Sequence, residues 1–156
     1  MKHNMNITTN TVVMKPNINY LKKNVDILKK INVKNIQFRF IDGKNVLNEY
    51  KKFVPLFTKT SPIITKIIEN NKNINFFLLD FPFCIFKKDI QKNITTLQKE
   101  RKNLSFHGSL VDTEFIENQT FSFPKCNNCK YRNTCSGIRN EYIKIYGIKE
   151  INPILE

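Results

Sequence analysis

The sequence predicts an α/β fold with parallel strands, followed by a small irregular cysteine-rich cap that ends in a helix. In the first half of the chain, short runs rich in β-branched and aromatic residues alternate with segments whose apolar residues recur at helical spacing. The connections between them are short, which favours strand–helix–strand units. Three of the four cysteines then fall within ten residues near the end of the chain. We therefore expect two regions, residues 1–83 and residues 84–156.

The first three elements form the expected strand–helix–strand unit. Ile7–Met14 is rich in Thr and Val, as strands are. Apolar residues recur at helical spacing over residues 19–31, and Asn35–Ile41 alternates apolar and polar residues as a half-buried strand does. Because a helix and short connections join the two strands, we expect the strands to be parallel.

Further elements precede the first cysteine. Lys44–Thr60 holds scattered apolar residues and is expected to be partly helical. Ser61 and Pro62 have the pattern of a helix N-cap followed by proline in the first turn, so we expect a helix from there to about Asn71. Ile74–Asp80 is apolar at nearly every position, which is typical of a parallel strand buried on both faces.

Cys84 comes just after this strand, at the carboxyl end where α/β sheets bind their ligands. Beyond it, Lys88–Lys99 is expected to hold a short helix, and the scattered aromatic residues of Leu104–Phe123 indicate irregular strands. Ile138–Tyr146 has helical periodicity and is predicted as the last helix, with Gly147 as its C-cap.

The composition limits the class of protein. With 156 residues, of which 40% are hydrophobic, the chain is neither disordered, collagen-like nor a coiled coil. The formal net charge is +13, but the lysines are scattered and only four arginines occur, so a solvated lysine surface is favoured over nucleic-acid binding. The apolar runs are too short to span a bilayer, and Met1–Met14 lacks the pattern of a secretion leader. We expect a cytoplasmic protein with no membrane attachment.

The four cysteines carry the most information about function. Cys126, Cys129 and Cys135 form a C-x2-C-x5-C block, and Cys84 is the fourth. In a reducing compartment such thiols bind metals rather than form a disulfide framework. Two asparagines inside the C-x2-C unit favour a tight turn that aims both thiols at one centre, and Gly137 lets the backbone approach that centre. We expect all four thiolates to ligate one centre.

Two kinds of centre suit four thiolates: one Zn(II) ion or an iron–sulfur cluster. Zinc ribbons pair two C-x2-C units, whereas this chain has one such unit, a five-residue gap and one remote cysteine. A [4Fe–4S] cluster is larger, tolerates uneven spacing and favours dry aromatic surroundings. The aromatic candidates to line it are Phe81, Phe83, Phe86, Phe121 and Phe123. The sequence favours the cluster, and zinc or unligated thiols remain the alternatives.

The cysteine block, with Phe81–Cys84 before it and Tyr142 and Tyr146 after it, resembles the auxiliary-cluster region of radical S-adenosylmethionine (SAM) proteins, of the SPASM or twitch type. The preceding strands and helices resemble the later βα units of the radical SAM barrel. The resemblance implies a partial, half βα barrel over residues 1–83 and an auxiliary-cluster region over residues 84–156. It also implies an auxiliary [4Fe–4S] cluster that supports electron transfer or substrate positioning in an anaerobic setting, often on peptide or protein substrates.

The chain departs from that family in one respect. Radical SAM enzymes cleave SAM with a cluster held by a C-x3-C-x2-C loop, and no cysteine precedes Cys84 here. The resemblance therefore implies a truncated or split member that binds SAM only when another polypeptide supplies the missing half barrel. Such a polypeptide would pair with the exposed strand edge at Ile7–Met14. Alone, the chain is not expected to cleave SAM, which leaves its status as an enzyme open.

Two rival readings and several single residues complete the predictions. A basic zinc-binding module that contacts nucleic acid is the alternative function, and a non-functional remnant of a decayed gene is a third reading. Arg39 either contacts the carboxylate of SAM or faces solvent. Asp80 is interpreted as a strand terminus in preference to a hydrogen-bond acceptor, and His107 as an ordinary surface residue in preference to an acid or base. Tyr142 and Tyr146 are expected to be packing residues.

Overall fold

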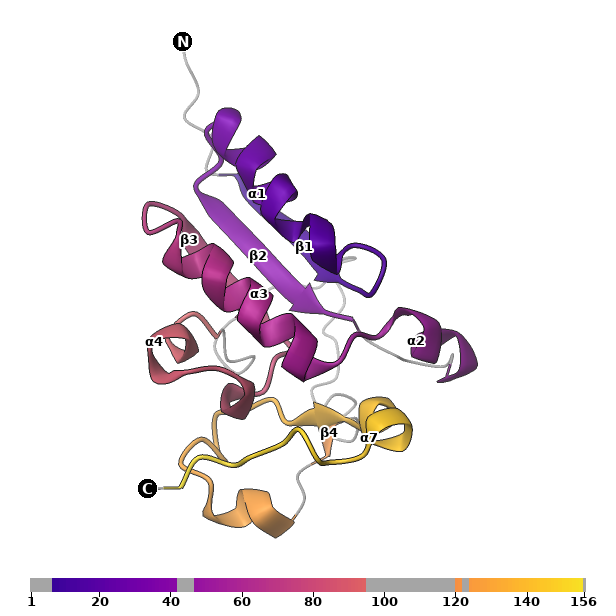
Figure 1. Ribbon diagram of the computed structural model, residues 1–156. Coiled ribbons are helices and arrows are strands. Elements are labelled where there is room, and N and C mark those ends of the chain that lie inside the picture. The colour runs from indigo at the N-terminus through magenta and orange to yellow at the C-terminus, as the bar shows by residue number, and fades with distance from the viewer. Residues whose placement is uncertain (1–6, 42–46, 95–119, 122–123, 156) are drawn as a thin grey trace, which may run out of the picture.

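A computed structural model describes residues 7–41, 47–94, 120–121 and 124–155 of the chain (Figure 1). Helices and strands alternate through the first two thirds, and short 3-10 turns join some of them. The strands are β1 (Thr8–Val13), β2 (Asn35–Phe40), β3 (Asn75–Leu79), β4 (Thr120–Phe121) and β5 (Ile138–Arg139). The α-helices are α1 (Leu21–Lys30), α2 (Leu47–Phe53), α3 (Phe57–Glu69), α4 (Lys88–Gln91) and α7 (Asn140–Tyr146). The 3-10 turns are η1 (Ile18–Tyr20), η2 (Phe83–Ile85) and η3 (Pro124–Asn128).

The main sheet is open, has three strands and is parallel throughout, in the order β1-β2-β3. Thr8 lies opposite Asn35, and Asn35 opposite Asn75, so the three strands begin at the same level. This arrangement confirms the predicted α/β class and the strand–helix–strand unit. The outer edge of β3 is partly covered, since the N–H of Leu78 donates to the carbonyl of Asn93 at 2.8 Å. Among the described residues, no strand pairs with the outer edge of β1.

Both long helices, α1 and α3, lie on the same face of the sheet (Figure 1). Alternate residues of β2 point into this layer, and Ile36, Phe38 and Phe40 are all buried. The residues between them are only half-buried. The same alternation holds in β3, so the prediction that Ile74–Asp80 is buried on both faces was wrong. Within the described part of the chain, α1 and α3 cover only one face of the main sheet.

Helix α3 begins at Phe57, so the prediction that Ser61 and Pro62 start this helix was wrong. Pro62 instead lies inside the helix, where its missing N–H leaves the carbonyl of Thr58 without its helical partner. Thr58 is exposed, so water can hydrate that carbonyl. Residues of the C-terminal region contact the first residue of this helix. The backbone N–H of Phe57 donates to the hydroxyl of Tyr142 at 3.0 Å and to the carboxylate of Glu150 at 3.3 Å.

The C-terminal region packs against the carboxyl end of the sheet and shares one core with it. Tyr142 stacks on Phe57 with ring centroids 4.2 Å apart and meets Phe40 at 5.9 Å, which confirms its predicted packing role. Its helix begins at Asn140 rather than Ile138, because Ile138–Arg139 is extended as β5 and pairs antiparallel with β4. Gly147 ends the helix with a φ of +70°, as a C-cap glycine does.

The other predicted segments are described only in part. The loose Lys44–Thr60 segment contains α2 and the start of α3, and the helix predicted over Lys88–Lys99 is present as α4, with residues 95–99 outside the described residues. Of Leu104–Phe123 only β4 is described, and His107 also lies outside the described residues. None of the helices that the structure describes combines the length and apolar character needed to cross a membrane.

Candidate metal centre

Cys84 is positioned by the segment that leaves β3. The chain turns sharply at Asp80, whose φ is +60°, and Phe81 then enters the core, where its ring meets those of Phe40 at 5.3 Å and Phe86 at 5.7 Å. Pro82 leads into η2, in which Cys84 is half-buried. The burial of Phe81 therefore fixes Cys84 just beyond the carboxyl end of the sheet, as predicted.

The other three cysteines lie in a compact loop of successive turns. The N–H of Cys129 donates to the carbonyl of Cys126 at 3.0 Å, and the N–H of Cys135 donates to the carbonyl of Tyr131 at 2.7 Å. After the last cysteine, Gly137 has a φ of +71°, and its N–H approaches the Sγ of Cys135 at 3.4 Å. This positive φ is the conformation that the predicted role of Gly137 required.

A pair of stacked aromatic rings joins the two cysteine segments. Phe83, next to Cys84, stacks on Tyr131 with ring centroids 4.2 Å apart and planes at 11°. The hydroxyl of Tyr131 donates to the side-chain oxygen of Gln91 at 2.9 Å. The amide nitrogen of Gln91, which is buried, donates in turn to the carbonyl of Phe86 at 2.9 Å. The loop is thus held against η2 by stacking and by a hydrogen-bonded buried side chain.

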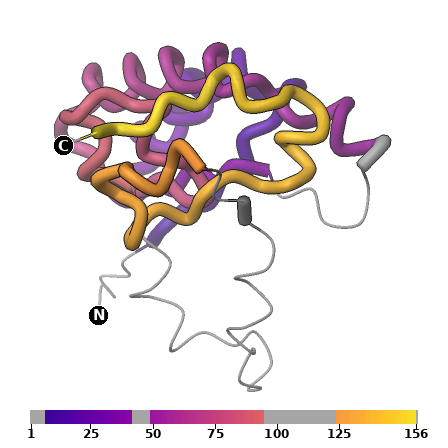
Figure 2. The backbone as a smooth tube through the Cα atoms, turned by 90° about the horizontal axis from the view of Figure 1, so that it is seen from below, coloured from indigo at the N-terminus to yellow at the C-terminus, as the bar shows by residue number. Residues whose placement is uncertain are grey.

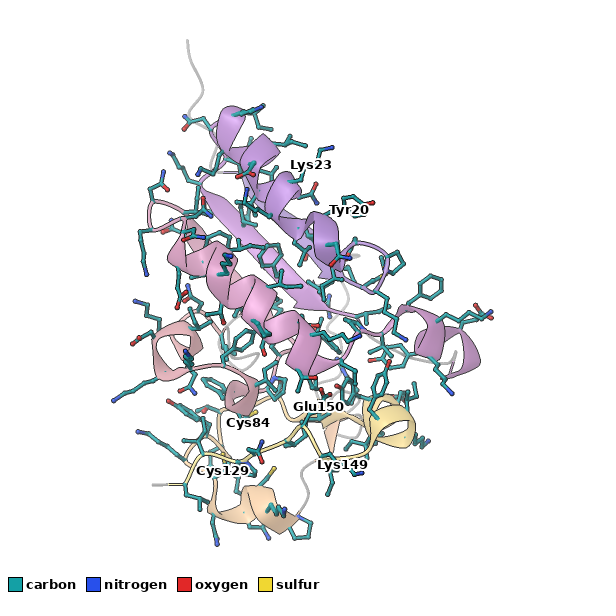
Figure 3. The ribbon with its side chains drawn as sticks, viewed as in Figure 1. Tyr20, Lys23, Cys84, Cys129, Lys149 and Glu150 are labelled. Carbon is teal, nitrogen blue, oxygen red and sulfur yellow. The ribbon has the colours of Figure 1, made fainter. Side chains whose placement is uncertain are left out.

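All four cysteines line one small cavity, of about 50 Å³. The cavity is mainly apolar, and Figure 3 shows Cys84 and Cys129 on either side of the region between η2 and the cysteine loop. The remaining lining residues are Pro82, Phe83, Arg132, Gly137, Ile138, Ile151 and Pro153. One water molecule needs a cavity of about 10–15 Å³, so this cavity has room for a larger group. None of the four cysteines is in a disulfide.

Burial and mutual proximity change the acidity of these thiols. Burial raises the pKa of Cys84 to about 12, and the neighbouring thiol of Cys135 adds to this rise. Burial also raises the pKa of Cys135. At neutral pH these two thiols are therefore protonated until a cation replaces their protons, which is how thiolate metal sites load.

The structure brings together the four cysteines that the sequence singled out, from positions up to 51 residues apart. Of the predicted aromatic lining, Phe83 faces the cavity, whereas Phe81 and Phe86 pack in the core behind it. The side chains of Phe121 and Phe123 lie outside the described residues. Tyr131 and Arg132 also belong to the site, although no sequence pattern singled them out. Their position between Cys129 and Cys135 was the available signal.

The thiols share a cavity without forming a site for a single ion. Within the described ranges, no group of three or more His, Cys, Asp or Glu side chains is arranged to hold one metal ion.

A second polar cluster lies at the carboxyl end of β3. The carboxylate of Asp80 accepts a hydrogen bond from Nε of Arg39 at 2.7 Å, and Nη2 of Arg139 lies 3.5 Å from its other oxygen. Asp80 and Arg139 are buried, whereas the side chain of Arg39 is 36% exposed. The interpretation of Asp80 as no more than a strand terminus was therefore incomplete. Arg39 does not simply face solvent, because it is ion-paired.

Comparison with known proteins gives no match to any family, to any curated protein or to any solved structure.

Proposed function

We propose that Cys84, Cys126, Cys129 and Cys135 bind one [4Fe–4S] cluster. The observation that carries the proposal is the shared cavity, to which two segments far apart in the sequence each contribute thiols. Four thiolates are the usual ligand set of such a cluster. The mainly apolar lining and the half-buried position of the cysteines suit a centre that must be shielded from water.

The spacing of the cysteines favours a cluster over zinc, because the chain has one C-x2-C unit and one remote cysteine, whereas a zinc ribbon pairs two C-x2-C units. The shared cavity is mainly apolar and has room for more than one water molecule. A basic zinc-binding module that contacts nucleic acid remains the second candidate, because a net charge of +13 suits a nucleic-acid partner.

We further propose that the chain is a truncated or split relative of radical SAM proteins. The open parallel sheet with helices on one face is compatible with part of a βα barrel, and the candidate centre lies beyond the carboxyl end of that sheet. In this proposal the edge of β1, with which no described strand pairs, receives the polypeptide that completes the barrel and binds SAM. This chain would then supply the auxiliary cluster, and the other polypeptide would bind SAM.

A cluster with four thiolate ligands leaves no iron open to a substrate. An electron-transfer role is therefore favoured over direct binding of a substrate, and the substrate itself, a peptide or protein by resemblance, would lie in the completed barrel. The residues of this chain would hold the centre, keep water from it and position its thiols. Tyr131 and Phe83 would do the positioning, since their stack joins the two cysteine segments.

Anaerobic reconstitution with ferrous iron and sulfide, with a parallel sample loaded with zinc, tests the proposal. The expected result is about four irons per chain and broad absorbance at about 400 nm, lost on exposure to air. A colourless chain that binds one zinc per molecule and takes up no iron would overturn the cluster and favour the zinc module. A chain that binds neither metal would favour the decayed remnant.

A further inference from the structure

The loop that carries three of the cysteines has an unbalanced positive charge. Residues 124–139 contain four basic residues and no Asp or Glu. Three of these, Lys125, Lys130 and Arg132, are exposed, and no ion pair to any of the three occurs among the described residues. We call these three residues the basic surface.

Two of these residues, Lys130 and Arg132, line an open depression. Its volume is about 590 Å³, and its wall is polar, made of amide and basic side chains with one cysteine. The lining residues are Asn127, Asn128, Cys129, Lys130, Arg132, Asn133 and Leu155. None of them is acidic, so the depression presents hydrogen-bond donors and positive charge to whatever enters it.

The depression adjoins the candidate metal centre. Cys129 and Arg132 line both the depression and the cavity that holds the four thiols. The two spaces therefore share two lining residues of the cysteine loop. A molecule seated in the depression would contact residues that also line the cavity of the candidate centre.

Two of the three charges of the basic surface contact neighbouring side chains. A terminal nitrogen of Arg132 donates to the side-chain oxygen of Asn127, and the ammonium of Lys130 lies 5.9 Å from the centre of the Tyr131 ring. The backbone N–H of Lys130 donates to the carbonyl of Ile154 at 2.8 Å, which ties the loop to the C-terminal segment. Figure 2, which looks onto this end of the molecule, shows these two segments side by side. Side chains with such contacts lose less conformational entropy when a partner binds.

We propose that the basic surface is the docking site of a small acidic protein that carries electrons to or from the centre. This inference rests on the proposed function, because it assigns a partner to that same centre. Complementary charge steers such partners into brief, specific encounters over small areas. One electron passes between the carrier's own iron–sulfur or flavin group and the centre. No bond forms or breaks in this exchange, and no proton is transferred.

A protein partner is favoured over nucleic acid by the shape and composition of this surface. Two of the three charges, Lys130 and Arg132, line a depression with an asparagine-rich wall, and the three do not form the long stripe that follows a phosphate backbone. Only one of the three is an arginine, the residue that grips phosphate bidentately. Carboxylate side chains on a folded carrier can meet both the lysines and the amides.

The test measures binding to the reconstituted full chain. The probe is a plant-type [2Fe–2S] ferredoxin, which is acidic, in its oxidised form, and a single-stranded DNA oligonucleotide serves as a second probe. Binding is measured by calorimetry at about 20 mM and about 200 mM salt, since screening weakens charged encounters over this range. The variant is Lys130→Glu with Arg132→Glu. The matched control is Lys23→Glu with Lys34→Glu, which makes the same change in net charge.

The control residues are exposed and lie far from the cysteines. Lys23 is on α1 at a distance from Cys129, as Figure 3 shows, and Lys34 precedes β2 at the opposite end of the sheet from Cys84. We expect the surface variant to weaken ferredoxin binding about tenfold or more and the control about twofold or less, because short-range complementarity, not net charge, decides the contact. The higher salt concentration should weaken the wild-type complex strongly.

The iron content and the absorbance of each sample keep the two proposals separate. A wild-type chain without a cluster overturns the proposed function, and the docking result then has no bearing. With the cluster present, equal losses in the two variants would overturn the docking site, and so would tighter, variant-sensitive binding of the oligonucleotide. If the surface variant fails to retain its cluster, Lys125→Glu alone, outside the lining of both cavities, is expected to weaken binding about threefold with the cluster intact.

Discussion

The ring of Phe83 lies parallel to that of Tyr131, with their centroids 4.2 Å apart. Phe83 precedes one candidate ligand directly, and Tyr131 lies between two others, so this stack fixes the distance between the segments that must share a centre. The hydroxyl of Tyr131 adds a hydrogen bond to Gln91. Stacking and hydrogen bonding can be removed separately.

Replacement of Tyr131 is therefore expected to lower metal retention in two steps. Tyr131→Phe keeps the stack and loses one hydrogen bond, so it should cost about 1 kcal/mol of stability and little of the iron content. Tyr131→Ala also removes an aromatic pair worth about 0.5–1.5 kcal/mol beyond its buried area, and it should lose most of the iron after gel filtration. Thermal unfolding and iron analysis of both variants check this. Full iron retention in Tyr131→Ala would show that the stack does not position the thiols.

Cys84 is the ligand whose loss tests the shared centre most directly, since the other three are already together in one loop. Cys84→Ser removes the only thiol from the sheet side of the cavity and should lower bound iron from about four per chain to less than half of that. Ser136→Ala, beside Cys135, is the matched control and should leave the iron content unchanged. Equal iron in the two variants would mean that Cys84 is not a ligand.

The sequence was sufficient to predict the elements that depend on local pattern. The apolar run before Asp80 identified β3 and hence the place of Cys84, and helical spacing identified α1. Local pattern was misleading where distant residues decide the outcome. The Ser61–Pro62 signal for a helix start is a local one, but Glu150 and Tyr142 bind the backbone at Phe57, and no local signal reports contacts across about 90 residues.

The candidate site shows the same division. The spacing of Cys126, Cys129 and Cys135 predicted that these residues lie together, because a turn is a local structure. That Cys84 joins them depends on Phe83 meeting Tyr131 and on Phe81 entering the core, and these are contacts between distant segments. Similarly, Ile138–Arg139 has helical periodicity but becomes a strand because β4 is available to pair with it.

Glu150 provides a prediction of pH dependence. Its carboxylate accepts hydrogen bonds from the backbone N–H of Thr58 at 3.0 Å and of Phe57 at 3.3 Å, so it caps the N-terminus of α3 from the end of the chain. Burial alone would raise the pKa of this carboxyl, but hydrogen bonds from Thr58, Tyr142 and the backbone lower it below its usual value of 4.5. Stability from this contact is therefore present above pH 4.5 and is lost as the pH falls through the lower, folded pKa.

The variant Glu150→Gln should thus be less stable than the wild type at pH 7, by about 1 kcal/mol, as expected for a lost charged cap. The difference between the two proteins should shrink as the pH is lowered from about 5 to about 3. Glu69→Gln, at the opposite end of the same helix, is the matched control and should have no such cap to lose. Melting temperatures of the wild type and of Glu150→Gln across this pH range test the prediction. A difference between the two proteins that stays constant would contradict the capping role.

Asp80 combines two constraints that substitution can separate. Its φ of +60° is tolerated by Asn but not by Ala, and its carboxylate lies between Arg39 and buried Arg139. Asp80→Asn keeps the backbone conformation and should destabilise the protein by about 3 kcal/mol, since it removes a carboxylate that lies beside the buried guanidinium of Arg139. Asp80→Ala should cost about 1 kcal/mol more, for the strained φ. Urea unfolding measures both, and equal values would show that the backbone at this turn is not strained.

The outer edge of β1 pairs with no strand in the part of the chain that the structure describes, and it leads to the last prediction. Five large apolar side chains are exposed on this edge and the adjoining helical segments: Ile7, Val12, Tyr20, Ile27 and Ile31. Thr8–Val13 contains neither a charge nor a proline, the residues by which natural edge strands avoid pairing with other chains. Without the proposed partner polypeptide, the chain should therefore associate with itself through this edge. The +13 charge opposes self-association at low salt, so the association should grow as salt screens the repulsion.

Light scattering coupled to gel filtration should show a mass that rises with salt and protein concentration. Val12→Lys places a charge in the edge strand and should restore the monomer, because pairing would then bring two lysines together across the strands. Ile148→Lys makes the same change at a comparably exposed apolar residue outside this edge, and it should leave the association as it was. If both variants suppress association equally, the cause is the added charge, and β1 is then not the surface through which this chain meets another polypeptide.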